Sequence, residues 1–165
     1  MSKAIEDRIF TAAMSRLAGR ISNARFIAVA MVAQAKHETG NFRSNAFRKH
    51  NNAFGYMYYP ASKYQQKKPG LIADNKLPVA HYATIEDSAK EVADWILRRK
   101  SSFEGVTTLR QFAETLKAKG YYGDTVTNYL RGLVHYAKDL NPKIIVPGVS
   151  VFLLVVGAVL FYLLK

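Results

Sequence analysis

The stretch from Ser22 to Glu38 constrains the fold of this chain most, because it is apolar on nearly every side and ends in a carboxylate. A helix that is apolar all round lies buried among other helices. Ser22 belongs to a residue type that caps helix N-termini, and Thr39-Gly40 forms a stop signal. We therefore predict a central buried helix from Ser22 to about Glu38, with the carboxyl group in its last turn.

Further helices are predicted where apolar residues recur at helical spacing. The expected helices cover Lys3–Ala18, Thr84 to about Leu97, Thr108–Gly120 and Asp124 to about Leu140, with a short helical turn over Arg43–Lys49. Their caps are expected to be Thr84 with Asp87, Thr108 with Gln111, and Asp124.

Two short β-prone segments, Tyr56–Tyr59 and Val79–Tyr82, lie between the helical regions. They can pair as a hairpin, and the Asn51–Gly55 stretch before them is typical of a loop. The predicted fold is therefore a mainly α domain with a small β-hairpin lobe.

The C-terminal end is uncharged and almost wholly apolar from Ile144 to Leu164. A helix of this length, at about 1.5 Å per residue, spans about 30 Å, the hydrocarbon thickness of a bilayer. Asn141-Pro142 interrupts the helical pattern just before it. We predict a globular domain over residues 1–141 and a single-pass transmembrane anchor over residues 142–165.

The formal net charge of the 165-residue chain is +12. This balance favours polyanionic surroundings such as cell-wall polymers or anionic lipid head groups. The basic residues are dispersed rather than set in a recognisable reading motif, so nucleic acid is not an expected partner. The chain has no cysteine, which excludes disulfide and thiolate chemistry.

Glu38 has the setting of a general acid. Glycoside cleavage needs a proton delivered to the leaving oxygen, so the acid must keep its proton near neutral pH. Burial disfavours the charged carboxylate, and so does the negative end of a helix dipole. A solvated, purely structural glutamate is the alternative, but the helix C-terminus is an unfavourable place for one.

The histidines do not predict a metal site, and no cofactor is expected. His37-Glu38 has the start of a zinc-protease helix motif, but Asn41 stands where the second histidine is required. His50, His81 and His135 lack metal-type spacing, and the chain has no Gly-rich phosphate loop.

Four motifs follow one another along the chain and carry a family resemblance. They are Ala33-Gln34-Ala35 with Glu38-Thr39-Gly40, Asn52-Ala53-Phe54-Gly55, Tyr82-Ala83-Thr84 with Asp87-Ser88, and Gly120-Tyr121-Tyr122-Gly123-Asp124 with Tyr129. In their order and spacing the chain resembles the glucosaminidase-type peptidoglycan hydrolases (glycoside hydrolase family 73) of the lysozyme superfamily. The resemblance implies a lysozyme-like helical fold that cuts the glycan strands of peptidoglycan.

The resemblance also implies roles for particular residues. It implies that Glu38 is the catalytic acid and that Asn52 and Phe54 shape the floor of the site. It also implies that Tyr121 or Tyr122 lines the site, with Tyr129 on the final helix. Independently, aromatic faces pack against sugar rings, so Tyr56, Tyr58 and Tyr82 are expected to contact substrate, although core packing is the alternative for Tyr82.

The second catalytic group is the point at which the chain departs from the family. Many members place a second carboxylate, usually Glu, on the hairpin, whereas Asp74 is the only acidic residue between Tyr56 and Tyr82. Asp74 is therefore a candidate base or nucleophile, or a plain turn residue. Without it, the substrate's acetamido group can attack, or Glu38 alone can act as in lytic transglycosylases.

The expected function is an endo-β-N-acetylglucosaminidase of peptidoglycan, held in a lipid membrane by Ile144–Leu164. Charged residues over Met1–Phe10 exclude an ordinary signal peptide, and the basic domain before the tail conflicts with export. We therefore expect a phage protein of an internal virion membrane, with virion proteins as possible partners, acting in entry or lysis. The alternatives are a non-catalytic wall-binding or structural virion protein, and a basic membrane protein that binds nucleic acid.

Overall fold

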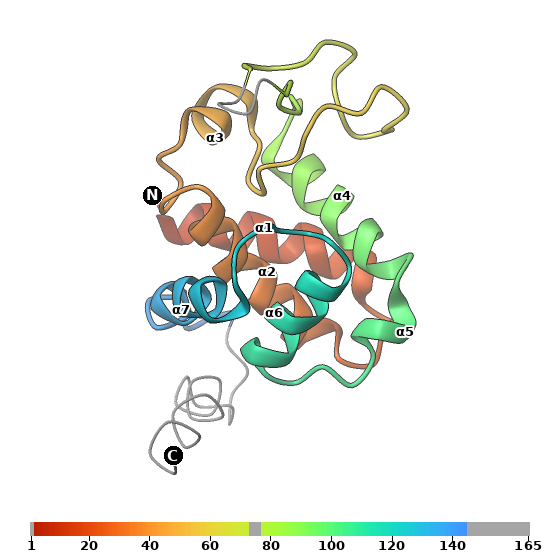
Figure 1. The fold of residues 1–165 in the computed structure, drawn as a ribbon, viewed down its shortest axis with the longest axis vertical. Coiled ribbons are helices and arrows are strands. Elements are labelled where there is room, and N and C mark those ends of the chain that lie inside the picture. Colours follow the sequence, from red (N-terminus) through yellow and green to blue (C-terminus); the bar gives the residue numbers. More distant parts are fainter. Residues whose placement is uncertain (1, 73–76, 145–165) are drawn as a thin grey trace.

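The computed structural model describes residues 2–72 and 77–144, and this part of the chain is mainly helical (Figure 1). Its helices are α1 (Ser2–Leu17), α2 (Ala24–Glu38), α3 (Asn45–His50), α4 (Ile85–Leu97), α5 (Lys100–Phe103), α6 (Leu109–Ala118) and α7 (Val126–Ala137). The predicted mainly α fold is confirmed, and the short α5 was not predicted.

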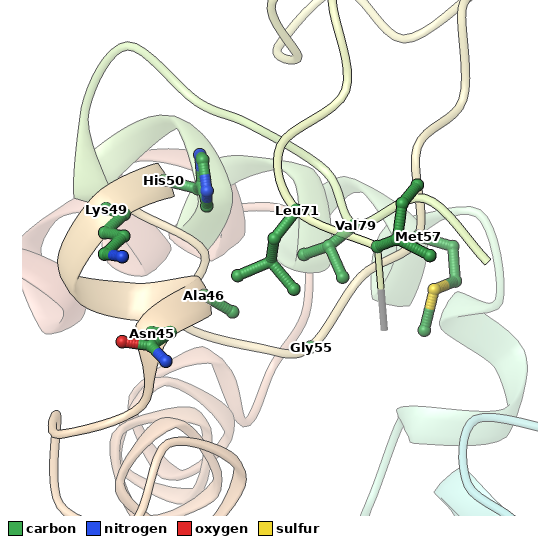
Figure 2. Close-up of a pocket in the computed structure, with 9 residues that line it drawn as sticks. Asn45, Ala46, Lys49, His50, Gly55, Met57, Leu71 and Val79 are labelled. Carbon is green, nitrogen blue, oxygen red and sulfur yellow. The ribbon is translucent and has the colours of Figure 1, made fainter. Parts of the chain in front are cut away.

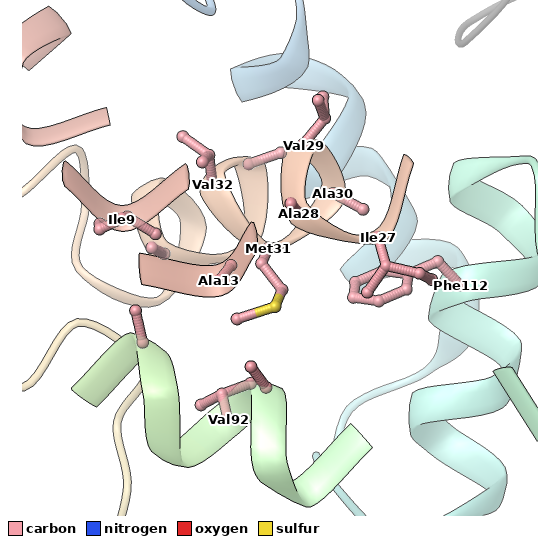
Figure 3. Packing of buried hydrophobic residues seen from close by; sticks show 14 of the residues in the cluster. Ile9, Ala13, Ile27, Ala28, Val29, Ala30, Met31, Val32, Val92 and Phe112 are labelled. Carbon is pink, nitrogen blue, oxygen red and sulfur yellow. The ribbon is translucent and has the colours of Figure 1, made fainter. Parts of the chain in front are cut away.

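Helix α2 is the centre of the domain. Figure 3 shows Met31 of α2 between Ile9 and Ala13 of α1 and Val92 of α4, while Phe112 of α6 packs near the start of α2. Met31 and Ile9 are fully buried, as are most side chains of α2. Burying a side chain of this size stabilises the fold by about 1.5–3 kcal/mol, so the all-round apolar pattern is explained by packing on several sides.

The predicted helix caps are confirmed in part. The hydroxyl of Thr84 accepts a hydrogen bond from the amide of Asp87, and Thr108 forms a full capping box with Gln111. The other two predicted caps are each wrong by one residue. The central helix begins after Asn23, whose side-chain amide group does not cap the helix but donates to two distant carbonyls, and α7 is capped by Thr125.

Asp124 supports α7 from outside the helix. Its Oδ1 accepts hydrogen bonds from the amide of Thr125 at 2.6 Å and from the side chain of Asn128 at 3.1 Å. These bonds hold the pKa of Asp124 below its usual range. The carboxylate thus fixes the capping residue rather than capping the helix itself.

The predicted hairpin is found as irregular pairing rather than as two strands. Met57 and Val79 form an isolated antiparallel bridge, flanked by hydrogen bonds from the amide of Tyr58 to Pro78 and from the amide of Ala80 to Tyr56. Residues 65–72 pair with the other side of the 78–82 segment. Proline has no amide to donate, so a regular ladder through Pro78 does not form. This irregular lobe lies above α1 and α2 in Figure 1.

The lobe is tied to the helical body by Asp94 of α4. Its carboxylate accepts hydrogen bonds from Arg16 of α1 at 2.8 and 3.1 Å and from the hydroxyl of Tyr64 at 2.7 Å. Burial raises the pKa of Asp94, but these bonds and that of Lys63 outweigh it and bring the pKa to about 2. Residues 62–65 are therefore held against α4.

The C-terminal end of the described chain packs on the core. Ile144 is 3% exposed, and its amide donates to the carbonyl of Asn141. The rest of the predicted transmembrane segment, residues 145–164, lies outside the described residues. Among the helices that the structure describes, none has the length and apolar character needed to span a membrane.

Candidate active site

Glu38 is the last residue of α2 and is followed by a left-handed turn. The hydroxyl of Thr39 donates one turn back along the helix at 2.6 Å and accepts from the amide of Phe42 at 2.8 Å. Gly40, Asn41 and Phe42 have φ angles of 56°, 61° and 65°. Left-handed backbone costs about 1–2 kcal/mol at a residue with a side chain. Burial of Phe42 at 7% exposure offsets this cost.

Two segments distant in sequence contact the carboxyl group of Glu38. The hydroxyl of Tyr129, on α7, donates a hydrogen bond of 2.7 Å to Oε1. On the other side lies Gly55, where a Cβ atom would stand 3.7 Å from Oε2 of Glu38. No ion pair involves Glu38 in residues 2–72 and 77–144. The group is therefore partly buried beside a phenol, with no cation to stabilise its charge.

This environment favours the protonated acid. Burial raises the pKa of Glu38, and the hydrogen bond from Tyr129 opposes the rise only in part. The carbonyl end of α2 further disfavours a negative charge. Burial and the nearby Glu38 charge also raise the pKa of Tyr129, so its phenol remains a donor. The arrangement can deliver a proton from Glu38 to a bound oxygen atom.

Gly132 allows α7 to approach α2 closely enough for this contact. A Cβ atom at Gly132 would collide with the ring of His37, which precedes Glu38. The His37 ring also meets Tyr129 edge-on, with centroids 4.9 Å apart. Sequence reasoning missed both Gly132 and the role of His37. An isolated glycine inside a helical pattern was the available signal, since it often marks close packing.

Tyrosines of the 120–129 region surround this contact. Tyr122 stacks on Tyr129 with centroids 3.7 Å apart and an angle of 6° between the ring planes. Tyr121 packs edge-on against Trp95 of α4, and its hydroxyl donates to the carbonyl of Phe54 at 3.2 Å. The structure thus brings Tyr121, Tyr122 and Tyr129 together near Glu38, the region in which they were predicted.

Asn52 builds the turn that carries Gly55 to the acid. Its side-chain oxygen accepts from the amides of Phe54 and Tyr56, and its amide group donates to the carbonyls of Tyr56 and Ala80. Asn52 is fully buried and Phe54 is 2% exposed. Both residues therefore support the site from below, a position consistent with the predicted role in shaping its floor. Their side chains have little exposed surface for contact with a substrate.

The predicted lobe tyrosines have different surroundings. Tyr56 is partly buried and packs against Tyr121, with centroids 5.7 Å apart, whereas the hydroxyl of Tyr58 donates to the carbonyl of Lys67. Tyr82 lies in the core instead of the site. It is 1% exposed, and its hydroxyl donates to Glu91 at 2.6 Å, so it presents no face to a sugar.

The described part of the lobe contains no candidate for a second catalytic carboxylate. Neither residues 51–72 nor residues 77–84, which the structure describes, contain an aspartate or glutamate. Asp74, the predicted second group, lies outside the described residues. In the part of the chain that the structure describes, no cluster of three or more potential metal-ligating side chains is found.

A groove of about 700 Å³ is lined in part by Gly55, the glycine at which an added Cβ atom would lie 3.7 Å from Oε2 of Glu38. Figure 2 shows α3 on one side of it, and Met57, Leu71 and Val79 of the lobe on the other. This volume lies within the range of about 300–1,000 Å³ that ligand sites occupy. Sequence reasoning did not predict the groove, because it depends on how α3 meets the lobe.

A helical domain that presents one partly buried carboxyl group beside such a groove is typical of lysozyme-like glycoside hydrolases. The model of the glucosaminidase family, described as mannosyl-glycoprotein endo-beta-N-acetylglucosaminidase, matches residues 20–142. The chain therefore belongs to the glucosaminidase family. The family assignment confirms the prediction of a glycoside hydrolase that acts on peptidoglycan.

A solved structure supports the fold. The catalytic domain of the autolysin Auto from Listeria monocytogenes superimposes with a TM-score of 0.56 and 21% sequence identity, over 83% of this chain and 82% of that domain. In the comparison with curated proteins, nothing matches this chain.

Proposed function

We propose that this protein is an endo-β-N-acetylglucosaminidase of peptidoglycan in which Glu38 is the general acid. The observation that carries the proposal is the carboxyl group itself. It is partly buried, has a raised pKa, accepts a hydrogen bond from Tyr129, and lies beside Gly55, which lines the groove. The proposal places the glycosidic oxygen at the Gly55 side of the groove, next to the proton of Glu38.

The test is digestion of purified peptidoglycan, with the released fragments identified by mass spectrometry. The wild-type protein should release fragments with N-acetylglucosamine at the reducing end. Glu38→Gln keeps the side-chain shape but removes the proton, and should lower the rate by at least about 10²-fold. Glu114→Gln, an exposed change of the same kind on α6, is the matched control and should leave the rate unchanged.

A second mechanism is favoured by the single carboxyl group in the described part of the site. In a lytic transglycosylase, Glu38 would act first as acid and then as base, and the products would carry anhydromuramyl ends. Asp74→Asn separates the possibilities, because it should slow the reaction only if two carboxylates take part. A folded protein with no Glu38-dependent product would instead support a non-catalytic wall-binding or structural role.

We also propose that residues 144–164 attach the enzyme to a membrane, and that this membrane belongs to a phage particle. The support for membrane attachment is the uncharged, apolar sequence of this segment, and the phage assignment rests on the conflict between the strongly basic domain before it and ordinary export. Flotation with lipid vesicles should carry the full chain upward and leave a chain ending at Lys143 in the dense fraction. Protein found only in the membranes of uninfected bacteria, with its domain in the cytosol, would contradict the phage assignment.

A further inference from the structure

The groove beside Gly55 has two chemically different walls. The wall from α3 is polar and carries Asn45, Lys49 and His50. The facing wall is apolar, and two of its residues are unusually open, with Met57 at 37% and Ile72 at 61% exposure. Exposed apolar side chains that line a concave surface mark a place where a ligand covers them.

Lys49 gives the polar wall an uncompensated positive charge. It is exposed on the last turn of α3 and forms no ion pair with any residue that the structure describes. None of the nine residues that line the groove is acidic. A lone exposed lysine usually faces only water, but this one shares a groove with unfilled apolar surface. The groove therefore favours a ligand that joins an anionic group to apolar groups.

His50 adds a polar group without adding charge. Burial lowers the pKa of His50, and the nearby His81 and Lys49 lower it further. Its ring meets His81 edge-on, with centroids 5.0 Å apart, and a Cβ atom at Gly70 would stand 2.7 Å from it. The ring is thus fixed between α3 and the lobe, and Lys49 is the cationic member of this wall.

Peptidoglycan offers a ligand of this kind. Its glycan strand carries short peptides that combine alanine methyl groups with free carboxylates, whereas chitin has the same type of sugar backbone without them. We propose that the groove binds the stem peptide of peptidoglycan, with Lys49 pairing with a carboxylate of that peptide. This inference rests on the proposed function, because Gly55, which lines the groove, lies next to the proposed catalytic acid.

The experiment compares wild-type protein, Lys49→Gln and Lys3→Gln on three forms of peptidoglycan. Lys3 is an exposed lysine on α1 that does not line the groove, so its variant makes the same charge change elsewhere. The substrates are intact strands, strands whose carboxylates are converted to methylamides, and strands stripped of peptides by an amidase. Stripped strands keep a carboxylate only on the lactyl group of the sugar.

On intact strands, Lys49→Gln should raise KM by about 5- to 10-fold with little change in kcat, the expected loss for one charge-assisted contact. On amidated and stripped strands, Lys49→Gln should have the same KM as the wild type. Lys3→Gln should have the wild-type KM on all three substrates. An unchanged KM on intact strands overturns the proposal. A loss that persists on stripped strands also overturns it, because it assigns Lys49 to the lactyl carboxylate.

A binding experiment distinguishes failure of this inference from failure of the proposed function. Soluble disaccharide-peptide fragments and neutral chitin oligomers are titrated into the Glu38→Gln protein, with and without Lys49→Gln. Lys49-dependent binding of the peptide-bearing fragments supports the groove assignment even if no strand is ever cut. Equal binding of the fragments and of chitin oligomers by both proteins contradicts it.

Discussion

The hydroxyl of Tyr129 donates a hydrogen bond of 2.7 Å to Oε1 of Glu38, which joins the first turn of α7 to the last residue of α2. The bond stabilises the charged carboxylate and so lowers its pKa, against the larger effect of burial. The two residues are 91 positions apart in sequence. Tyr129 is thus placed to tune the acid as well as to orient it.

Tyr129→Phe should move the alkaline limb of the pH–activity profile to higher pH. A general acid works only while protonated, so activity falls as the pH rises through the pKa of Glu38. Losing the hydrogen bond removes stabilisation of the charged form and raises that pKa further. The measurement is kcat/KM against pH on intact peptidoglycan. Tyr136→Phe, also on α7, is the control, and a limb that moves to lower pH in Tyr129→Phe would contradict the assignment.

Glu38→Gln should become more stable relative to the wild type as the pH rises from about 4 to 8. The pKa of Glu38 in the folded protein is raised above the ordinary value of 4.5. Its contribution to stability is therefore fully present below that ordinary value and is lost as the pH rises through the folded pKa. Thermal melts of both proteins across this range test the sign. A difference in Tm that is independent of pH would exclude burial as the dominant influence on this group.

Gly132→Ala should destabilise the protein by about 1–3 kcal/mol, the usual cost of overpacking. The new methyl group would collide with the ring of His37, which cannot move freely because it also contacts Tyr129. Because the collision separates α7 from α2, activity should fall together with stability. Urea unfolding measures the first and peptidoglycan digestion the second. Gly123→Ala, where a Cβ atom would meet nothing within 4 Å, is the control and should change neither.

Local chemistry explains which helix ends were predictable. The caps at Thr84 and Thr108 depend only on residues three positions apart, and both were predicted correctly. The caps predicted at Ser22 and Asp124 are wrong because other hydrogen bonds decide where α2 and α7 begin. One of these bonds is long-range and the other joins neighbouring residues. The amide of Ser22 donates to Glu104, 82 residues away, and this contact places the chain before α2 begins.

Residue spacing by itself predicted the site only where its residues follow one another in the chain, whereas Tyr129 was predicted through the family resemblance. The Glu38 turn and the Asn52–Gly55 turn could be recognised as motifs, and both lie at the site. Their partners could not be derived from periodicity, since Tyr129 reaches Glu38, and Gly132 meets His37, only when α7 packs on α2. Tyr82 was predicted to contact substrate but lies in the core, where its hydroxyl bonds the carboxylate of Glu91. β-Propensity cannot distinguish such a buried tyrosine from one that faces a ligand.

A buried ion pair two residues before the acid gives the last prediction. Nζ of Lys36 lies 2.9 Å from Oε1 of Glu6, with side-chain exposures of 4% and 1%. The other oxygen of Glu6 accepts from the amide of Asn141 at 2.7 Å. The pair thus joins α1, α2 and the segment that leads out of the domain.

Lys36→Met should destabilise the protein by about 3–5 kcal/mol, because it leaves the buried carboxylate of Glu6 without its cation. Adding Glu6→Gln should recover part of this loss, since the neutral amide oxygen can still accept from the amide of Asn141. Arg110→Met, which breaks a surface pair of 3.8 Å with Glu114, is the control and should cost no more than about 0.5 kcal/mol. Unfolding free energies of the two single variants and the double variant give the coupling. If the two losses simply add, the pair does not act as a buried unit.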